Sequence, residues 1–386
     1  MTVADHAPLA SKDSAAGARV LFVERRLPAY RVPFFDAARQ ALAARGIAFE
    51  LAHGQADAEE RSRDDAGRLD WALPAPNHYV GRLSWQPVAT SGFDLVIASH
   101  ENRLLYNLWL GRPGRPHRFA YFGHGANFAA RQPDAWRERF KQVTARRADW
   151  WFAYTELSAA RLRQAGVAPG RITVVDNAID TSTLAQQVAA FSPDQAAPRR
   201  AALGLHAGKT ALFIGSLHAA KRLDLLFDTA QRCAQADPAF RLLVVGDGPD
   251  AARCRSLADQ GAPWLRWLGA QHGPQRAEPL ALADLLLMPA AVGLGILDGF
   301  AAGLPLLTTS LPGHGPEIAY LRPGGNGEIT EPDAATLSQA LQSLLNDPAR
   351  LARLQAGARE AAARHTLAAM VERFAGGVQA ALVADR

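Results

Sequence analysis

The chain has 386 residues, a length typical of roughly two to three domains, so it can bury a large core without disulfides or metal ions. Hydrophobic residues make up 48% and charged residues 20% of the sequence, which excludes a disordered chain. The net charge is +5, and the only cysteines, Cys233 and Cys254, exclude a disulfide scaffold and favour a reducing compartment.

The positive charge is concentrated in the first half of the chain. The first 183 residues hold 24 Lys and Arg against 19 Asp and Glu, whereas residues 184–386 hold 18 of each. Residues 103–147 are the most basic part. This local excess of cations favours an anionic partner.

The start of the chain lacks the features of a secretory signal. Residues 1–18 are small, polar and mixed in charge, so we expect a flexible tail. No window approaches the ~20 uncharged apolar residues of a membrane-spanning helix. We expect a cytoplasmic protein, with peripheral attachment to the cytoplasmic face of the inner membrane as the open alternative.

From residue 19 onward, short apolar runs alternate with longer amphipathic ones. The pattern predicts strands at 19–24 and 47–54 around a helix at 31–46, and the same alternation continues to residue 183. Such units are typical of a parallel sheet covered by helices on both faces. Residues 19–183 are therefore predicted to form an N-terminal α/β domain.

A second alternating series follows a segment rich in Pro and Gly. Residues 184–208 are predicted to be a linker, and residues 209–364 a second doubly wound domain. Residues 365–386 have helical spacing and are expected to pack back toward the N-terminal domain. The fold class is thus α/β, with two tandem doubly wound, Rossmann-like parallel-sheet domains facing each other across a cleft, the default active site.

The segment 213–229 (FIGSLHAAKRLDLLFDT) has the composition of a phosphate-binding turn. Gly215 and Ser216 follow a strand, and Lys221 with Arg222 opens the next helix. A cation beside helix amides suits an anionic diphosphate. The alternative is a surface helix with two solvated cations.

The segment 288–310 carries a second glycine turn before a helix. Gly293 and Gly295, on either side of Leu294, would let backbone amides approach a ligand, and the Asp298 carboxylate could accept hydrogen bonds from ribose hydroxyls. Tight packing of an Ala/Gly-rich helix on the sheet would also explain the glycines, but it leaves Asp298 without a role.

Two further positions fall at the carboxyl ends of predicted strands. His124 lies between two glycines and would face the cleft, unless it is a hydrogen-bonded structural residue. The turn after the first strand carries Arg25, Arg26, Tyr30 and Arg31, which would face the cleft or remain solvated loop residues.

Several common motifs are absent. The GLHAGKT segment at 204–210 has three residues between its glycines instead of the four of a P-loop, and GDGPD at 246–250 lacks the third glycine of a dinucleotide fingerprint. The sequence has no HExxH, no G-x-S-x-G and no Asp-x-Asp after an apolar strand. Metal-dependent hydrolysis and serine chemistry are disfavoured, and no metal site is expected.

Taken together, these motifs resemble those of the family 4 glycosyltransferases, which have the GT-B fold. The likeness is strongest over residues 210–327 and looser in YRVPFF at 30–35, FGHG at 122–125 and VVDNAID at 174–180. The resemblance implies a metal-independent hexosyltransferase without a cofactor, which moves a sugar from a nucleotide donor with retention of configuration.

The resemblance also implies a role for each matched residue. Lys221 would hold the donor diphosphate with the amides of Gly293 to Gly295, Asp298 would bind the ribose, and His124 would face the sugar. These expectations make His124, Lys221 and Asp298 the catalytic candidates. The donor-binding candidates are Gly215, Ser216, Lys221, Arg222, Gly293, Leu294, Gly295 and Asp298, and the acceptor-side candidates are Arg25, Arg26, Tyr30 and Arg31.

The implied partners are a UDP- or GDP-linked sugar and a glycan or lipid-linked acceptor used in surface polysaccharide synthesis, without nucleic acid. An anionic membrane surface is a further candidate partner for residues 134–147. There Trp136, Phe140 and Val143 recur at helical spacing among cations, as in an interfacial helix. The alternative is that this apolar stripe packs on the sheet.

The sequence departs from the family pattern in ways that favour a rival. The family has two glutamates separated by seven residues; Asp298 stands at the second, and the first is missing from a short AAVGLG segment. Ser216 replaces an arginine, and ERRLPAYR at 24–31 replaces a glycine pair. The rival is a catalytically weak nucleotide-sugar-binding or scaffold subunit, and a nucleotide-sugar epimerase has less support.

Overall fold

The computed structural model describes residues 17–57, 65–81, 83–101, 104–125 and 143–384. The chain divides into two compact units, each taken by itself here. The first comprises residues 1–122, 147–151 and 374–386, and the second comprises 123–146 and 152–373.

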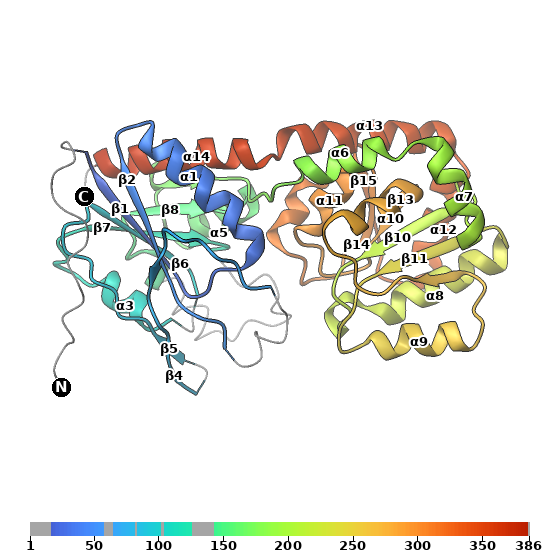
Figure 1. The fold of residues 1–386 in the computed structure, drawn as a ribbon, viewed down its shortest axis with the longest axis horizontal. Coiled ribbons are helices and arrows are strands. Elements are labelled where there is room, and N and C mark those ends of the chain that lie inside the picture. The colour runs from blue at the N-terminus through green and yellow to red at the C-terminus, as the bar shows by residue number, and fades with distance from the viewer. Residues whose placement is uncertain (1–16, 58–64, 82, 102–103, 126–142, 385–386) are drawn as a thin grey trace. The chain divides into compact units, whose positions relative to one another are not determined.

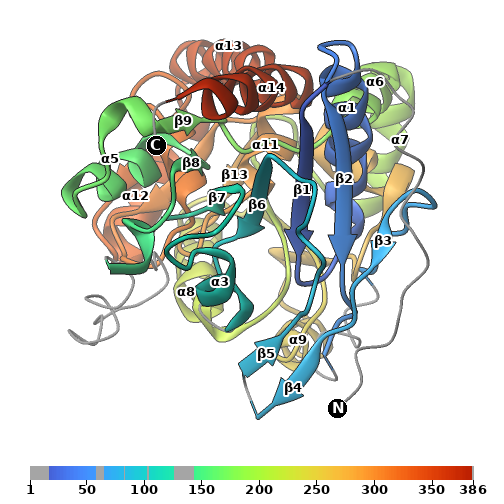
Figure 2. The same cartoon turned by 90° about the vertical axis from the view of Figure 1, so that its left-hand side faces the viewer.

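The first unit is built on a seven-stranded sheet in the order β3-β2-β1-β6-β7-β8-β9, which Figure 2 shows from right to left. Its central pairs, β1 with β2 and β6, and β6 with β7, are parallel. The last part of β8 and all of β9 are counted with the second unit. The strands are β1 Arg19–Glu24, β2 Ala48–His53, β3 Leu73–Pro74, β6 Leu95–Ser99, β7 Arg118–Gly123, β8 Trp150–Ala153 and β9 Ile172–Val174.

Aromatic rings form the core of this unit. Phe22 of β1 is fully buried, and its ring lies 5.0 Å from that of Phe35 in α1 and 5.3 Å from that of Phe122 in β7. Phe374 of the C-terminal helix α14 joins them, 5.2 Å from Phe34. The other elements of this unit are α1 Val32–Ala43, the antiparallel pair β4 His78–Val80 and β5 Leu83–Trp85, α3 Tyr106–Leu110 and the part of α14 Leu367–Val383 from Phe374 onward. Helix α5 Glu156–Gln164 is counted with the second unit.

The second unit contains a six-stranded sheet in the order β12-β11-β10-β13-β14-β15, in which every pair is parallel. All residues of β10 are buried, as expected for a strand covered on both faces. Figure 1 shows β10, β11, β13 and β14 side by side with helices on their flanks. The strands are β10 Thr210–Ile214, β11 Arg241–Val245, β12 Leu265–Trp267, β13 Leu285–Leu287, β14 Leu306–Thr309 and β15 Gly327–Thr330.

The two parallel α/β sheets confirm the predicted fold class. The remaining helices are α6 Ser182–Ala190, α7 Pro193–Leu203, α8 Leu223–Ala236, α9 Ala251–Asp259, α10 Ala277–Leu282, α11 Gly295–Ala301, α12 Ala334–Leu345 and α13 Pro348–Arg364. None of the described helices is both long and apolar enough to cross a membrane.

The residues predicted as a linker, 184–208, form most of α6 and all of α7. Ser192 and Gln195 make a capping box, and Pro193 occupies the first turn of α7, so the polar and Pro-rich stretch begins a helix. Both helices belong to the second unit, where α6 contacts α10 and α11. Residues 134–142 of the basic segment lie outside the described residues, and Val143 is exposed.

Candidate functional site

Lys221 lies close to Gly215, the residue that follows β10. Gly215 has a φ of +151°, and a Cβ placed on it would lie 3.9 Å from Lys221 Nζ. The ammonium group donates a 2.6 Å hydrogen bond to the carbonyl oxygen of Ala291. Burial lowers the pKa of Lys221 to about 8, so the group carries its charge at neutral pH with little water around it.

The turn after β10 is braced by the turn after β11. Leu217 donates through its amide to the carbonyl of Asp247 at 2.8 Å, and Asp250 donates to the carbonyl of Leu217 at 3.0 Å. A Cβ on Gly246 would overlap the carbonyl oxygen of Gly215. GDGPD at 246–250, which carries no dinucleotide fingerprint, therefore supports the turn after β10. Its paired glycines after a strand are the sequence signal for such close backbone packing.

Ser216 and Arg222, two further donor-site candidates, lie in surroundings that differ from those of Lys221. Ser216 is exposed. Arg222 has a φ of +53° at the start of α8, and its guanidinium pairs with Asp224 at 2.7 Å. Arg222 is thus already held by a carboxylate on its own helix, whereas Lys221 is held by a backbone carbonyl of residue 291.

We call residues 288–295 the donor loop. The hydroxyl groups of Thr308 and Thr309, at the end of β14, donate to the carbonyls of Met288 and Pro289 at 2.6 and 2.7 Å. Two residues further along, Lys221 donates to the carbonyl of Ala291. Ala291 has a φ of +50°, which is unusual for a residue with a side chain. Side chains from two other elements thus fix the path of this loop.

The predicted glycine turn completes the donor loop. A Cβ on Gly293 would meet no atom within 4 Å, and one on Gly295 would meet its nearest atoms at 3.8 Å. The space beside both glycines is therefore open, as a ligand-facing turn requires. Leu294 is half-buried between them, and α11 begins at Gly295.

His314 holds the same loop and was missed by the sequence analysis. Its Nδ1 accepts a hydrogen bond from the Val292 amide at 3.1 Å, and its Nε2 lies 2.9 Å from the carbonyl oxygen of Thr309. Burial lowers the pKa of His314, and the charge of Lys221 lowers it further. The histidine directly follows Pro312 and Gly313, and this local sequence gives no signal for a contact with residue 292.

Asp298 lies in α11 with its side chain nearly buried, and it forms an ion pair with Arg276. Burial raises the pKa of Asp298, while the Arg276 guanidinium opposes that shift. Counting back seven intervening residues from Asp298 leads to Ala290, which is buried. At this spacing the chain therefore has no carboxylate before Asp298.

His124 is exposed in the turn after β7. Its ring packs edge-on against Tyr154, with centroids 4.5 Å apart. The following Gly125 has a φ of +69°, and a Cβ there would press on the Leu162 side chain at 2.8 Å. This fixes the glycine turn sterically.

The acceptor-side arginines of the first unit are engaged within it. Arg25 Nε donates to Glu101 at 2.6 Å, and Arg26 pairs with Asp65 at 2.7 Å. Arg31 is buried, with its guanidinium 5.3 Å from the centre of the Phe122 ring. Tyr30 remains 46% exposed.

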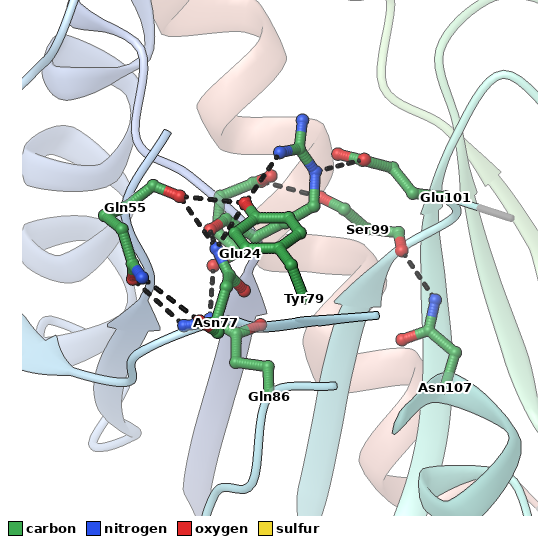
Figure 3. A network of polar contacts seen from close by, with 9 residues as sticks. Glu24, Gln55, Asn77, Tyr79, Gln86, Ser99, Glu101 and Asn107 are labelled. Carbon is green, nitrogen blue, oxygen red and sulfur yellow. Dashed lines mark hydrogen bonds and ion pairs between the residues drawn. The ribbon is translucent and has the colours of Figure 1, made fainter. Parts of the chain in front are cut away.

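Figure 3 shows the polar network that joins Glu24, Asn77 and Ser99 at the carboxyl ends of β1 and β6. Asn77 donates to the carbonyl of Arg25 at 2.7 Å, and Gln86 donates to the carbonyl of Glu24 at 2.9 Å. The hydroxyl of Ser99 donates to the Glu24 carboxylate at 2.6 Å. These hydrogen bonds fix Asn77 and Gln86, in the segment between β3 and β6, at the carboxyl end of β1.

Glu24 is the most perturbed acid of this network. Burial raises its pKa to about 7, the negative charge of Glu101 raises it as well, and the Ser99 hydrogen bond opposes both. The group therefore titrates near neutral pH. Within the described residues, no cluster of three or more His, Cys, Asp or Glu side chains is placed to hold a metal ion.

Two family models match consecutive parts of the chain. The model described as Glycosyltransferase Family 4 matches residues 34–183, and the one described as Glycosyl transferases group 1 matches residues 208–347. Every strand of the two sheets except β1 thus lies within one of the matched segments.

Named relatives are similar at moderate identity. A D-inositol 3-phosphate glycosyltransferase from Rhodococcus opacus is 29% identical over 73% of this chain and 61% of its own length. A GDP-mannose-dependent monoacylated alpha-(1-6)-phosphatidylinositol monomannoside mannosyltransferase from Corynebacterium glutamicum is 31% identical over 36% of this chain and 38% of its own. The chain thus spans about three-fifths of the length of the first relative.

Among solved structures, HepE from Anabaena in complex with UDP superimposes with a TM-score of 0.67 at 17% identity. The match covers 94% of this chain and 99% of HepE. A likeness at this identity concerns the fold, which is GT-B in this comparison.

Proposed function

We propose that this chain, a glycosyltransferase of the family 4 type with the GT-B fold, transfers a hexosyl unit from a UDP- or GDP-linked sugar with retention of configuration. The acceptor is a glycan or lipid-linked oligosaccharide used in surface polysaccharide synthesis. The single observation that carries the proposal is the Lys221 ammonium group, which links the turn after β10 to the donor loop.

The chemistry follows from that arrangement. Departure of a nucleoside diphosphate builds negative charge on its phosphate oxygens, and a fixed cation in a poorly hydrated place stabilises that charge well. Lys221 supplies the cation, and the open backbone at Gly293 and Gly295 leaves room for the phosphates. In this proposal the enzyme needs no metal ion for leaving-group departure.

Asp298 supplies the ribose contact in this proposal. Its carboxylate is kept near the end of the donor loop by the ion pair with Arg276. Ribose hydroxyls would donate to the oxygen atoms that Arg276 leaves accessible. His124 is assigned to the donor sugar, as the family resemblance implies.

The test is a screen of UDP- and GDP-sugars with lipid-linked and free glycan acceptors, with and without EDTA. We expect transfer that persists in EDTA and a product with the anomeric configuration of the donor sugar, read by NMR. Transfer with inversion, or transfer abolished by EDTA and restored by a divalent cation, contradicts the mechanism.

A binding subunit without transfer activity is the second candidate. It is favoured by Ala290 at the position of the first donor-loop glutamate and by Ser216 in the phosphate turn. This candidate predicts that a sugar nucleotide binds but is neither transferred nor hydrolysed with any acceptor in the screen.

For location, we propose a cytoplasmic protein that attaches peripherally to anionic membrane. The support is the basic sequence of residues 134–147, in which Arg137, Arg139 and Lys141 accompany Trp136 and Phe140. Flotation with anionic liposomes should weaken with salt and fall when these three cations become Ala. No flotation at low salt contradicts the proposal.

A further inference from the structure

The two ring nitrogens of His314 are bound to backbone groups of opposite kind. Nδ1 faces the Val292 amide at 3.1 Å and must accept, whereas Nε2 faces the Thr309 carbonyl at 2.9 Å and must donate. A single protonation state satisfies both contacts, the neutral ring with its proton on Nε2. The ring therefore bridges the end of β14 and the donor loop.

The contact falls on a strained part of the loop. Ala291 has a φ of +50°, a left-handed conformation that is unfavourable for a residue with a side chain. The next residue, Val292, is held through both backbone groups, since Gly315 donates to its carbonyl at 2.6 Å while its amide donates to His314. The turn 313–315 thus closes around Val292 and resists relaxation of Ala291.

Val292 stands between the two ligand-facing parts of the loop. The preceding carbonyl, at Ala291, anchors the Lys221 ammonium group, and the following residue is Gly293, beside open space. Any shift of Val292 moves both. We propose that His314 is a positioning residue of the donor site, whose neutral Nε2–H ring fixes Val292 and thereby sets Lys221 and Gly293 for the diphosphate; the inference rests on the proposed function.

Acid should release this contact. Protonation of Nδ1 turns it into a donor facing the Val292 amide, so the hydrogen bond is lost. Burial and the charge of Lys221 hold the pKa of His314 below its ordinary 6.5, although the bond to Thr309 opposes this. The nearest acid on the same turn is Glu317, which accepts a hydrogen bond from Asn177. The ring is thus neutral at pH 7, and the contact is lost only as the pH falls through a pKa that lies below the ordinary value.

The experiment measures binding of UDP-glucose and GDP-mannose to the full chain by calorimetry between pH 5 and 8.5. Neither sugar nucleotide has a phosphate that titrates in this range. We expect the affinity of the natural chain to fall toward the acid end of this range, and His314→Ala to lose roughly tenfold or more at pH 7.5, as small displacements at a site do. We call the loss of affinity at low pH the acid limb. His314→Asn, whose Oδ1 can accept a hydrogen bond from the Val292 amide, should recover much of the affinity and show no acid limb.

His365→Gln is the matched control, because His365 is another half-buried histidine, stacked on Tyr320 outside the donor loop. It should keep both the affinity and the acid limb. Two results overturn the inference: His314→Ala binding like the natural chain with its acid limb intact, or binding that tightens in acid in the natural chain but not in His314→Asn. The second result would make His314 a cation for the phosphates.

Nitrogen NMR of labelled histidine separates this inference from the proposed function. The His314 signals, assigned by their loss in His314→Asn, should show a neutral ring protonated on Nε2 at pH 7.5 without nucleotide. A ring that is charged at pH 7.5, or protonated on Nδ1, overturns the inference even where binding is strong. A natural chain that binds no nucleotide or sugar nucleotide at any pH refutes the proposed function instead.

Discussion

Lys221 gives the most direct test at the scale of single residues. Lys221→Ala should lower kcat/KM by an amount that corresponds to about 2 to 4 kcal/mol of transition-state stabilisation, because the variant loses a cation that stabilises the leaving diphosphate. Lys209→Ala is the control, since Lys209 pairs with Asp237 away from the donor loop. Because burial holds the pKa of Lys221 at about 8, affinity for the donor should also weaken above pH 8 in the natural chain. Unchanged kcat/KM in the variant would remove Lys221 from the site.

Glu24 makes stability depend on pH. Its folded pKa of about 7 lies above the ordinary 4.5, so its neutral form is favoured in the folded state. The contribution of Glu24 to the free energy of unfolding should therefore be highest below about pH 4.5, fall by about 3 kcal/mol as the pH rises to 7, and stay level above that.

Glu24→Gln should abolish this dependence, because the amide has the shape of the neutral acid and can still accept from Ser99. Urea unfolding at pH 5 and pH 8 measures the difference. Glu360→Gln, at a side chain that is 68% exposed, is the control and should behave like the natural chain. If the natural chain, Glu24→Gln and Glu360→Gln all lost the same stability between pH 5 and pH 8, the pH dependence would belong to groups other than Glu24.

At the scale of elements, the turn after β11 should affect donor affinity, because it supports the turn after β10. Gly246→Ala places a methyl group against the carbonyl oxygen of Gly215, and the φ of +147° is strained for alanine. The phosphate turn must move, so donor affinity should fall about tenfold or more. Gly261→Ala has open space around its Cβ and a positive φ, so it controls for backbone strain alone. Equal affinity in both variants would mean that the two turns are uncoupled.

At the scale of the whole molecule, the chain ends in the core of the unit in which it begins. Phe374 of α14 lies 5.2 Å from Phe34 and 6.4 Å from Phe22 between ring centroids, and it is fully buried. Phe374→Ala should therefore cost about 3 to 5 kcal/mol of unfolding free energy, because it leaves a cavity among aromatic rings. Val383→Ala, at an exposed position of the same helix, should cost little. A small effect of Phe374→Ala on urea unfolding would show that α14 is dispensable to this core.

The sequence by itself determined the two parallel sheets, since buried strands such as β10 read as unbroken apolar runs between amphipathic helices. It also singled out Gly215, Lys221 and Gly293, because turn glycines and a cation at a helix start are local patterns. The helices at 182–203 escaped it, because a Ser-Pro start has the same composition as a linker.

Only the tertiary structure decided which residues share a site. His314 meets Val292 and Arg276 meets Asp298 across 22 residues of sequence in each case, and Arg25 meets Glu101 across 76. Such pairs follow from the order of strands in a sheet and from the paths of the connecting turns, not from any local pattern of residues. The same distant contacts set the charge state of buried groups, so the neutral ring of His314 and the acidity of Glu24 could not be read from their neighbours in the chain.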